Sequence, residues 1–426
     1  MKIAYLAAGA GGMYCGACHR DMALVRQLIA RGHDVEILPL YTPLRADDDI
    51  PPTTRVFYGG VSCYLAQTGR IGTMVARVLD GLLSSNFALN LASKQALSTD
   101  PTELGALTVS VLSGKDGRQA DALKQLLAHF RKQPPEIVCL SNSLLSGIAP
   151  EVKAQLGVPI VCSLQGEETF VDALRAPYAD QARQRMRENA RAIDRFLATG
   201  ESVAAAMAEY LAVAPSRISV VRPGLDPERY PAATARPRDP FVIGYLSAIA
   251  PRKGLKVLVE AWHALTRERK RNAVLRVAGQ VLDRRYWDDV QALARTNGGE
   301  GRFEYVGELS REEKLGFLHS SSCFVLPSMT AEVRGLAAME AMASGVPVIL
   351  PDSGVFPELL VLTKGGVLTK PEDAAGLADA LARLMDEPDQ ADELGRNAAA
   401  GIRKHYTAGA MADRVEQILC ELLNTV

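Results

Sequence analysis

Residues 323–351 run CFVLPSMTAEVRGLAAMEAMASGVPVILP and form the most informative part of the sequence. Its apolar start predicts a buried strand, and a polar loop carrying Glu332 follows. Gly335 then begins a predicted helix that carries Glu340, and a second apolar strand ends the stretch. A helix that begins directly after a buried strand presents unpaired backbone N–H groups and the positive end of its dipole. The stretch therefore predicts an anion site around residues 334–337, suited to a diphosphate.

The same alternation of apolar runs and amphipathic stretches fills most of the chain. The predicted strands are residues 3–7, 35–40, 136–140, 158–164, 195–198, 218–221, 241–246, 274–278, 303–306, 323–326, 346–350 and 366–368. Strands that alternate with helices form parallel sheets covered on both faces. Ligands of such sheets bind beyond the carboxyl ends of the strands, so the cleft between two such domains is the expected site.

Two segments depart from this alternation. Residues 232–240, AATARPRDP, have no apolar period and contain two prolines, which predicts a linker between two domains. Residues 70–133 are mostly helical in pattern, with an apolar stripe at Leu123, Leu126, Leu127 and Phe130. We interpret this long segment as a helical elaboration of the first domain; a role in contacting a membrane or an acceptor is the alternative.

Composition restricts the function. The chain has 426 residues with 48 Lys and Arg against 49 Asp and Glu, a net charge of -1. This balance argues against a nucleic-acid binder or a membrane clamp that relies on bulk positive charge. With 48% hydrophobic and 23% charged residues, the chain has enough apolar mass for two cores.

The cysteines and the first residues favour a cytoplasmic protein. The seven cysteines are odd in number, and Cys139, Cys162 and Cys323 lie in apolar runs, as is typical of reduced, buried thiols. The uncharged stretch 3–18 is broken by glycines and is shorter than the roughly 20 residues that a membrane span needs. It imitates a signal peptide only weakly, and we expect a buried first strand instead.

The spacing of Glu332 and Glu340 alone does not show whether these residues have a function. Glutamate is a good helix former and usually lies on a solvated face. An ionised carboxylate also accepts two hydrogen bonds from neighbouring hydroxyls, which suits the diol of a sugar or ribose.

The surrounding residues decide between these possibilities. The string Glu332-x-x-Gly335-Leu336-x-x-x-Glu340, continuing to Pro347, resembles the E-x7-E signature of glycosyltransferase family 4. Matching residues before and after it include Lys253-Gly254, Gly307, Pro327-Ser328, Pro357-Glu358, and the string Val220 to Asp226 with Arg229-Tyr230. The resemblance covers most of the chain and its motifs occur in the family's order.

The resemblance implies a fold, a reaction and domain limits. The family's members are retaining sugar transferases of the GT-B fold: an α/β architecture of two Rossmann-like, doubly wound domains that face each other across a cleft. We expect an acceptor domain at residues 1–230 and a nucleotide-sugar donor domain at 231–406. The C-terminal helix, within 407–426, is expected to pack back on the first domain, as in relatives.

The resemblance also implies roles for individual residues. Glu340 would hold the ribose hydroxyls of a nucleoside-diphosphate sugar, and Glu332 a hydroxyl of the donor sugar. The backbone near Gly335 and Leu336 would meet the diphosphate. The glycine loop 9–12, with Gly11 and Gly12, would let the backbone approach phosphate or acceptor closely. An ordinary turn between strand and helix explains that loop equally well.

Three cations lie at the starts of predicted helices. Arg252 and Lys253 precede the helix that begins near Gly254, and Arg334 precedes the helix at Gly335. A cation at a helix N-terminus is unfavourable by roughly 0.3–1 kcal/mol unless an anion compensates it. The donor diphosphate would compensate all three. For the two arginines, side chains that simply extend into water are the competing interpretation.

Two positions depart from the family pattern. An Arg is common five positions before the matching lysine, and this chain has Ala248 there, so Arg252 or Arg334 is expected to replace that phosphate contact. Many relatives carry His where Gln165 aligns, close to the transferred sugar. Glutamine donates and accepts hydrogen bonds but does not shuttle protons near neutral pH. In the family's retaining reaction the departing phosphate can serve as the base.

Other classes of site are disfavoured. The string Cys15-x-x-Cys18-His19 matches the pattern of haem attachment, but it lies at a strand-to-helix turn of a chain expected in the cytoplasm. No second ligand pair supports a structural metal. We expect no cofactor and no metal, with a nucleotide sugar and an unidentified acceptor as partners, no nucleic acid, and possible peripheral membrane contact.

Two alternatives to a transferase stay open. Ala248 and Gln165 are compatible with a nucleotide-sugar-binding protein whose catalysis is weakened or lost. An epimerase or a phosphorylase can also be built on the same architecture, and fold analogy does not separate them.

Overall fold

The computed structural model describes residues 1–8, 16–40, 101–233, 236–296 and 302–424. The chain divides into two compact units, residues 1–222 together with 411–426, and residues 223–410. Residues 223–230, assigned above to the first domain, thus belong to the second unit. Each unit is described by itself.

The first unit contains one parallel sheet of order β2-β1-β3-β4-β5-β6 in its described part. Its strands are β1 Lys2–Ala7, β2 Asp34–Pro39, β3 Ile137–Leu140, β4 Ile160–Leu164, β5 Arg195–Ala198 and β6 Ile218–Val220. β1 pairs with β2 on one side, where Ile3 lies opposite Val35, and with β3 on the other, where Ile3 lies opposite Ile137. The point at which the strand order reverses therefore lies between β1 and β3.

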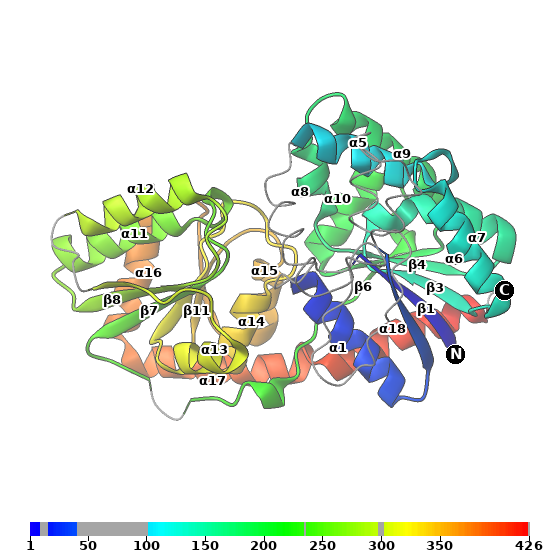
Figure 1. Ribbon diagram of the computed structural model, residues 1–426. Coiled ribbons are helices and arrows are strands. Elements are labelled where there is room, and N and C mark those ends of the chain that lie inside the picture. The colour runs from blue at the N-terminus through cyan, green and yellow to red at the C-terminus, as the bar shows by residue number, and fades with distance from the viewer. Residues whose placement is uncertain (9–15, 41–100, 234–235, 297–301, 425–426) are drawn as a thin grey trace. The chain divides into compact units, whose positions relative to one another are not determined.

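Helices cover both faces of this sheet (Figure 1). They are α1 Gly16–Ala30, α5 Pro101–Leu112, η1 Gly114–Asp116, α6 Ala120–Lys132, η2 Ser143–Ile148, α7 Ala149–Leu156, α8 Glu167–Asp172, α9 Tyr178–Asn189, η3 Ala190–Ala192, α10 Glu201–Leu211, η4 Pro215–Arg217 and α18 Ala408–Leu423. α1 and α18 bury Leu28 and Leu419 in one core with Tyr5 and Cys139 of the strands. The C-terminal helix therefore completes the core of the first unit.

The second unit repeats the architecture with a sheet of order β12-β11-β10-β7-β8-β9. Its strands are β7 Phe241–Leu246, β8 Ala273–Ala278, β9 Phe303–Tyr305, β10 Cys323–Val325, β11 Val348–Pro351 and β12 Gly366–Thr369. β7 pairs with β8 and with β10, all parallel. The reversal of strand order lies between β7 and β10, so the loops that follow these two strands border the expected ligand site.

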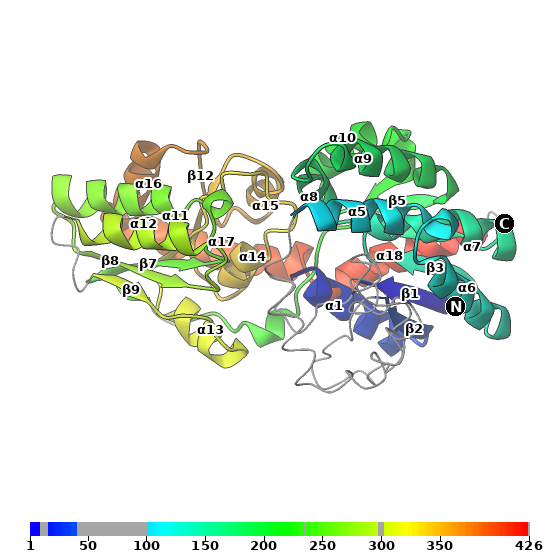
Figure 2. The ribbon, with the colours of Figure 1, turned by 45° about the horizontal axis from the view of Figure 1, so that its top comes forward.

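The helices of the second unit also lie on both faces of its sheet. They are η5 Pro227–Arg229, η6 Pro251–Lys253, α11 Leu255–His263, the π-helical turn η7 Ala264–Glu268, α12 Arg284–Arg295, α13 Arg311–His319, α14 Leu336–Ala343, α15 Phe356–Thr363, α16 Ala374–Asp386 and α17 Pro388–His405. α11 and α12 lie on one face, and α13 and α17 on the other (Figure 1). Figure 2 shows α13 on the side of the sheet away from α11 and α12. Trp262, Tyr245 and Phe324 are among the largest fully buried side chains of this core.

The two parallel sheets with flanking helices confirm the predicted fold class. Each predicted strand appears within two residues of its expected ends, and the helix predicted at Gly335 begins at Leu336. The stripe Leu123, Leu126, Leu127 and Phe130 is the buried face of α6. Residues 41–100, and with them residues 70–100 of the segment 70–133, lie outside the described residues. None of the described helices combines the length and the apolar character needed to cross a bilayer.

Candidate functional site

The loops after β7 and β10 of the second unit are packed against each other. Gly254 ends the turn η6 with φ +71°, and a Cβ there would lie 1.9 Å from the carbonyl oxygen of Pro327. The backbone N–H of Met329 donates to the carbonyl of Arg252 at 2.9 Å. Only glycine combines this left-handed backbone with such a close approach. The contact fixes the turn that carries Lys253 next to the loop that carries Glu332.

Lys253 and Glu332 form a largely buried ion pair at this junction. The ammonium of Lys253 contacts Oε1 of Glu332, and each side chain is only 14% exposed. The hydroxyl of Ser328 donates to the same oxygen at 2.8 Å. Burial by itself would raise the pKa of Glu332, but the charge and hydrogen bond of Lys253, the hydrogen bond of Ser328 and the charge of Arg334 hold it below its ordinary value. Glu332 is therefore an ionised acceptor at neutral pH.

A third loop, after β11, fixes the backbone of Glu332. The N–H of Val355 donates to the carbonyl of Glu332 at 2.9 Å. Gly354 has φ +61°, and a Cβ there would lie 2.3 Å from that carbonyl. Loops that follow three different strands thus hold the backbone and the carboxylate of Glu332, which suits a group that must be placed accurately.

The N-terminus of α14 lies three residues beyond Glu332. Its N-cap is Gly335, with φ +64° and no side-chain hydrogen bond to the first turn. Leu336 and Ala337 are half-buried, Arg334 is half-buried and Arg252 is exposed. The first backbone N–H groups of a helix lack intrahelical partners, and together with the helix dipole they favour an anion. The predicted diphosphate position therefore combines uncapped N–H groups with the cations of the same unit.

Glu340 lies one turn further along α14 and is held by two side chains. The ammonium of Lys314, on α13, and the hydroxyl of Tyr230 each lie 2.8 Å from its Oε1. Among the described residues, no hydrogen bond reaches Oε2 of either Glu332 or Glu340. Each glutamate therefore keeps one oxygen available to accept from a ligand hydroxyl.

No sequence pattern predicted a role for Lys314 or for Tyr230, although Tyr230 belongs to a string that matches the family. Lysine usually lies on the protein surface, so a single lysine in a predicted helix does not indicate a buried or functional side chain. A signal was nevertheless present, because Lys314 precedes the buried Phe317 and Leu318 by three and four residues and thus lies on the buried face of α13.

Gln165 lies in the first unit, directly after β4. Its Nε2 donates to the carbonyl of Ser141 at 2.7 Å and to Oδ1 of Asp21 at 3.2 Å. Arg20 donates from Nη1 to Asp21 at 3.1 Å and to Ser163 at 3.2 Å. These contacts hold the amide of Gln165 at the carboxyl ends of β3 and β4, beside the reversal of strand order.

Two carboxyl groups beside Gln165 are buried. Burial raises the pKa of Asp21 to about 6, against the opposing charge of Arg20 and hydrogen bonds from Tyr5, Gln165 and Arg20. Burial raises the pKa of Glu167 to about 7, although backbone N–H groups oppose the shift. Glu167 accepts from the N–H of Gln165 at 2.8 Å and from that of Ser143 at 3.1 Å. Glu167 therefore braces two loops rather than lying in solvent.

The predicted site residues fall into two groups. Glu332, Lys253, Glu340, Gly335, Leu336, Arg334 and Arg252 all belong to the second unit, and Gln165 belongs to the first. Gly11 and Gly12 lie outside the described residues. The described residues hold no group of three His, Cys, Asp or Glu side chains arranged to bind a metal ion.

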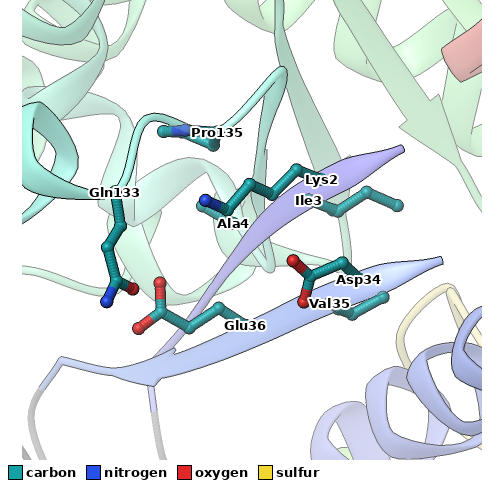
Figure 3. Close-up of a pocket in the computed structure, with 8 residues that line it drawn as sticks. All are labelled: Lys2, Ile3, Ala4, Asp34, Val35, Glu36, Gln133 and Pro135. Carbon is teal, nitrogen blue, oxygen red and sulfur yellow. The ribbon is translucent and has the colours of Figure 1, made fainter.

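A separate pocket lies at the amino-terminal ends of β1 and β2 (Figure 3). Its polar lining includes Lys2, Asp34, Glu36 and Gln133. Glu36 is paired with His129 at 2.8 Å. Because ligands of parallel sheets bind at the carboxyl ends of the strands, we assign no function to this pocket.

Two doubly wound units, each a parallel six-stranded sheet with flanking helices, define the GT-B class of fold. Comparison with known families agrees with this fold. The family model described as "Glycosyltransferase Family 4" matches residues 22–229, and the one described as "Glycosyl transferases group 1" matches residues 226–401. The chain belongs to glycosyltransferase family 4.

Individual relatives are distant. Glycogen synthase of Mycobacterium tuberculosis is 30% identical over 204 residues, covering 48% of this chain and 48% of the relative. A D-inositol 3-phosphate glycosyltransferase of Corynebacterium glutamicum (strain R) is 31% identical over 211 residues, covering 46% and 50%. The alignments thus span about half the length of these curated relatives.

Solved structures match over the whole chain. Sucrose-phosphate synthase from Thermosynechococcus elongatus has a TM-score of 0.73 at 17% identity, covering 100% of this chain and 99% of that one. Anabaena HepE in complex with UDP has a TM-score of 0.69 at 14% identity, covering 99% and 100%. At these identities the likeness establishes the fold.

Proposed function

We propose that this protein is a retaining glycosyltransferase that moves a sugar from a nucleoside-diphosphate sugar to an acceptor hydroxyl. The observation that carries the proposal is the position of the Lys253–Glu332 pair beside the uncapped N-terminus of α14, with Glu340 one turn further along the helix. A diphosphate sugar needs cations and N–H donors for phosphate and carboxylate acceptors for hydroxyls, and the second unit supplies both.

Stabilisation of negative charge would contribute most to the acceleration of sugar transfer. As the bond between sugar and diphosphate breaks, negative charge grows on the departing phosphate, and Lys253 with the N–H groups of Leu336 and Ala337 would stabilise it. Glu332 would orient the sugar through a hydroxyl. Fixed donors and acceptors are effective because they need no rearrangement during the reaction. Arg252 and Arg334 would supply the phosphate contact that Ala248 lacks.

The alternative function is a nucleotide-sugar-binding protein with weakened or lost catalysis. Gln165 favours it, because its Nε2 is already donated to Asp21 and to the carbonyl of Ser141. Both functions require donor binding, whereas only the enzyme releases nucleoside diphosphate from the donor. Slow release without acceptor, lost in Glu332→Ala, would support the enzyme; binding with no release in any condition would favour the alternative.

The first test measures binding of UDP, GDP and ADP by thermal shift. UDP is included because HepE, a structural relative, was solved with it. A ligand at one hundred times its dissociation constant stabilises the folded state by about 2.7 kcal/mol, which is easily detected. In Lys253→Met we expect affinity for the best diphosphate to fall about tenfold or more, because a cation against phosphate is lost and Glu332 is left unpaired.

One matched variant serves as a control, and a second variant tests Arg252. Lys404→Met removes an exposed lysine of α17 and should bind like the wild type. Arg252→Met removes the exposed neighbour of Lys253, and a loss there would show that Arg252 contacts phosphate. Absence of any shift with all three diphosphates in the wild-type protein would contradict the proposed function.

A further inference from the structure

Glu340 forms a buried charge pair with Lys314 through its oxygen Oε1. The side chain of Lys314 is only 8% exposed and that of Glu340 14%. A charge this deeply buried is unfavourable unless it is paired, so the two side chains stabilise each other in the folded protein. Both Lys314 and Tyr230 contact Oε1, at 2.8 Å each.

Lys314 is held in place by the structure of α13. Ser310 and Glu313 form a capping box at the start of the helix, and the N–H of Lys314 donates to the carbonyl of Ser310 at 2.9 Å. Phe317 and Leu318, on the same helix face, are buried. The lysine therefore reaches Glu340 from a fixed helix rather than from a loop.

Tyr230 reaches the same oxygen from a different segment. It follows the turn η5, where its N–H donates to the carbonyl of Pro227 at 3.1 Å. Its own carbonyl accepts from Arg403 of α17 at 3.4 Å. Two segments far apart in sequence thus converge on Oε1, while Oε2 accepts no hydrogen bond from the described residues.

We propose that Lys314 and Tyr230 are positioning residues that hold Glu340 for recognition of ribose hydroxyls, and that they set the preference of the site for ribonucleotides over deoxyribonucleotides. The inference rests on the proposed function. With Oε1 occupied by two donors, the carboxylate has one orientation and offers Oε2 to the ribose. Lys314 also offsets the negative charge of Glu340, which would otherwise repel a diphosphate nearby.

The test compares a ribonucleotide with its deoxy form. The tightest binder among UDP, GDP and ADP and its 2′-deoxy and 3′-deoxy analogues are titrated calorimetrically into full-length protein. A hydrogen bond to a charged acceptor corresponds to a preference of about ten- to hundredfold, which we expect of the wild type for at least one of the two hydroxyls. In Lys314→Met we expect that preference to fall to within roughly threefold of unity, as in Glu340→Gln.

A double-mutant cycle separates positioning from general stability. If Lys314 acts through Glu340, the double variant Lys314→Met/Glu340→Gln should discriminate no less than either single variant. Tyr230→Phe keeps the ion pair and removes one donor, so it should lower the preference in part and gives a test that is independent of whether Lys314→Met folds. Lys404→Met should keep the wild-type preference.

The outcomes distinguish the two proposals. If the wild-type protein binds none of the three diphosphates, the proposed function fails and this inference fails with it. If the wild type prefers the ribonucleotide and both Lys314→Met and Tyr230→Phe keep that preference unchanged, only the role of these two residues is overturned.

Discussion

Two buried acids lie next to Gln165, and each is held by donors rather than by solvent. Glu167 uses both oxygens to accept backbone N–H groups from Gln165 and Ser143. Asp21 accepts from Gln165 and from Arg20. These contacts tie the ends of β3 and β4 to α1, so the residues around the family's usual histidine position form a rigid support for the Gln165 amide.

The raised pKa of Glu167 predicts a pH-dependent stability of the first unit. Its pKa rises from 4.5 to about 7, so the folded state holds the proton more tightly than the unfolded state. The stabilisation is complete below the unfolded value and is lost as the pH rises toward 7. The difference is about 3 kcal/mol for this group at 1.36 kcal/mol per pKa unit. Asp21, with a pKa of about 6, adds in the same direction.

The variant Glu167→Gln should flatten this dependence. The amide of Gln does not ionise. In urea unfolding followed by far-UV circular dichroism at pH 5, 6 and 7.5, the free energy of unfolding should therefore decrease less with rising pH in this variant than in the wild type. At pH 5 the wild-type carboxyl is protonated, so both side chains are neutral there, and any difference in stability between the two proteins reflects local hydrogen bonding and not charge. The exposed Glu209→Gln should keep the wild-type slope. An equal slope in Glu167→Gln and the wild type would contradict the prediction.

At the scale of elements, the turn η6 depends on a single glycine. A side chain at Gly254 would collide with the carbonyl of Pro327 and would hold φ +71° under strain. In Gly254→Ala we expect the turn to move away from the loop after β10, which carries Lys253 out of reach of the phosphate. Misplacement of a binding group by about 1 Å can cost up to a hundredfold, so we expect diphosphate affinity to fall about tenfold or more.

Gly157 supplies a matched control for this substitution. It ends α7 with φ +69°, and a Cβ there would meet no heavy atom within 4 Å. Gly157→Ala should therefore cost only the strain of the left-handed backbone, about 1–2 kcal/mol, and leave binding unchanged. If calorimetry gave the two variants the same affinity, the close contact with Pro327 would have no role in the site.

The elements of this site were predictable to different degrees. The strand before Pro327 and the helix after Gly335 follow from local apolar period and backbone chemistry, so the sequence alone places Glu332 in the loop before this helix and Glu340 on it. The partners of these glutamates were not predictable in the same way. Lys314 lies 26 residues from Glu340, and Gln165 lies 144 residues from Asp21. The partner of a buried carboxylate depends on how distant helices pack against each other. The spacing of apolar residues along the sequence does not predict this packing.

At the scale of the whole molecule, the chain passes between the two units twice. After residue 410 it returns to the first unit, where α18 buries Met411, Val415, Ile418 and Leu419 against the sheet. The first unit therefore lacks part of its core until the C-terminal residues are present, although 188 residues of the second unit, 223–410, intervene.

This arrangement predicts that a core substitution in α18 destabilises the first unit selectively. Leu419 is fully buried, and Leu419→Ala should cost about 2–5 kcal/mol through lost contacts and a cavity. Both tryptophans, Trp262 and Trp287, lie in the second unit, so tryptophan fluorescence monitors that unit while far-UV circular dichroism monitors both. In Leu419→Ala the dichroism transition should move to lower denaturant while the fluorescence midpoint stays near the wild-type value.

The exposed neighbour Gln417 provides the control, since Gln417→Ala changes the same helix without opening the core. We propose that diphosphate binding depends on residues of the second unit, so binding of the best diphosphate should survive in Leu419→Ala at denaturant concentrations where the first unit has unfolded. A fluorescence midpoint that falls together with the dichroism midpoint would show instead that the two units unfold as one cooperative structure. In that case a core defect in α18 would reach the donor site through the whole molecule, and loss of diphosphate binding would accompany loss of the first unit.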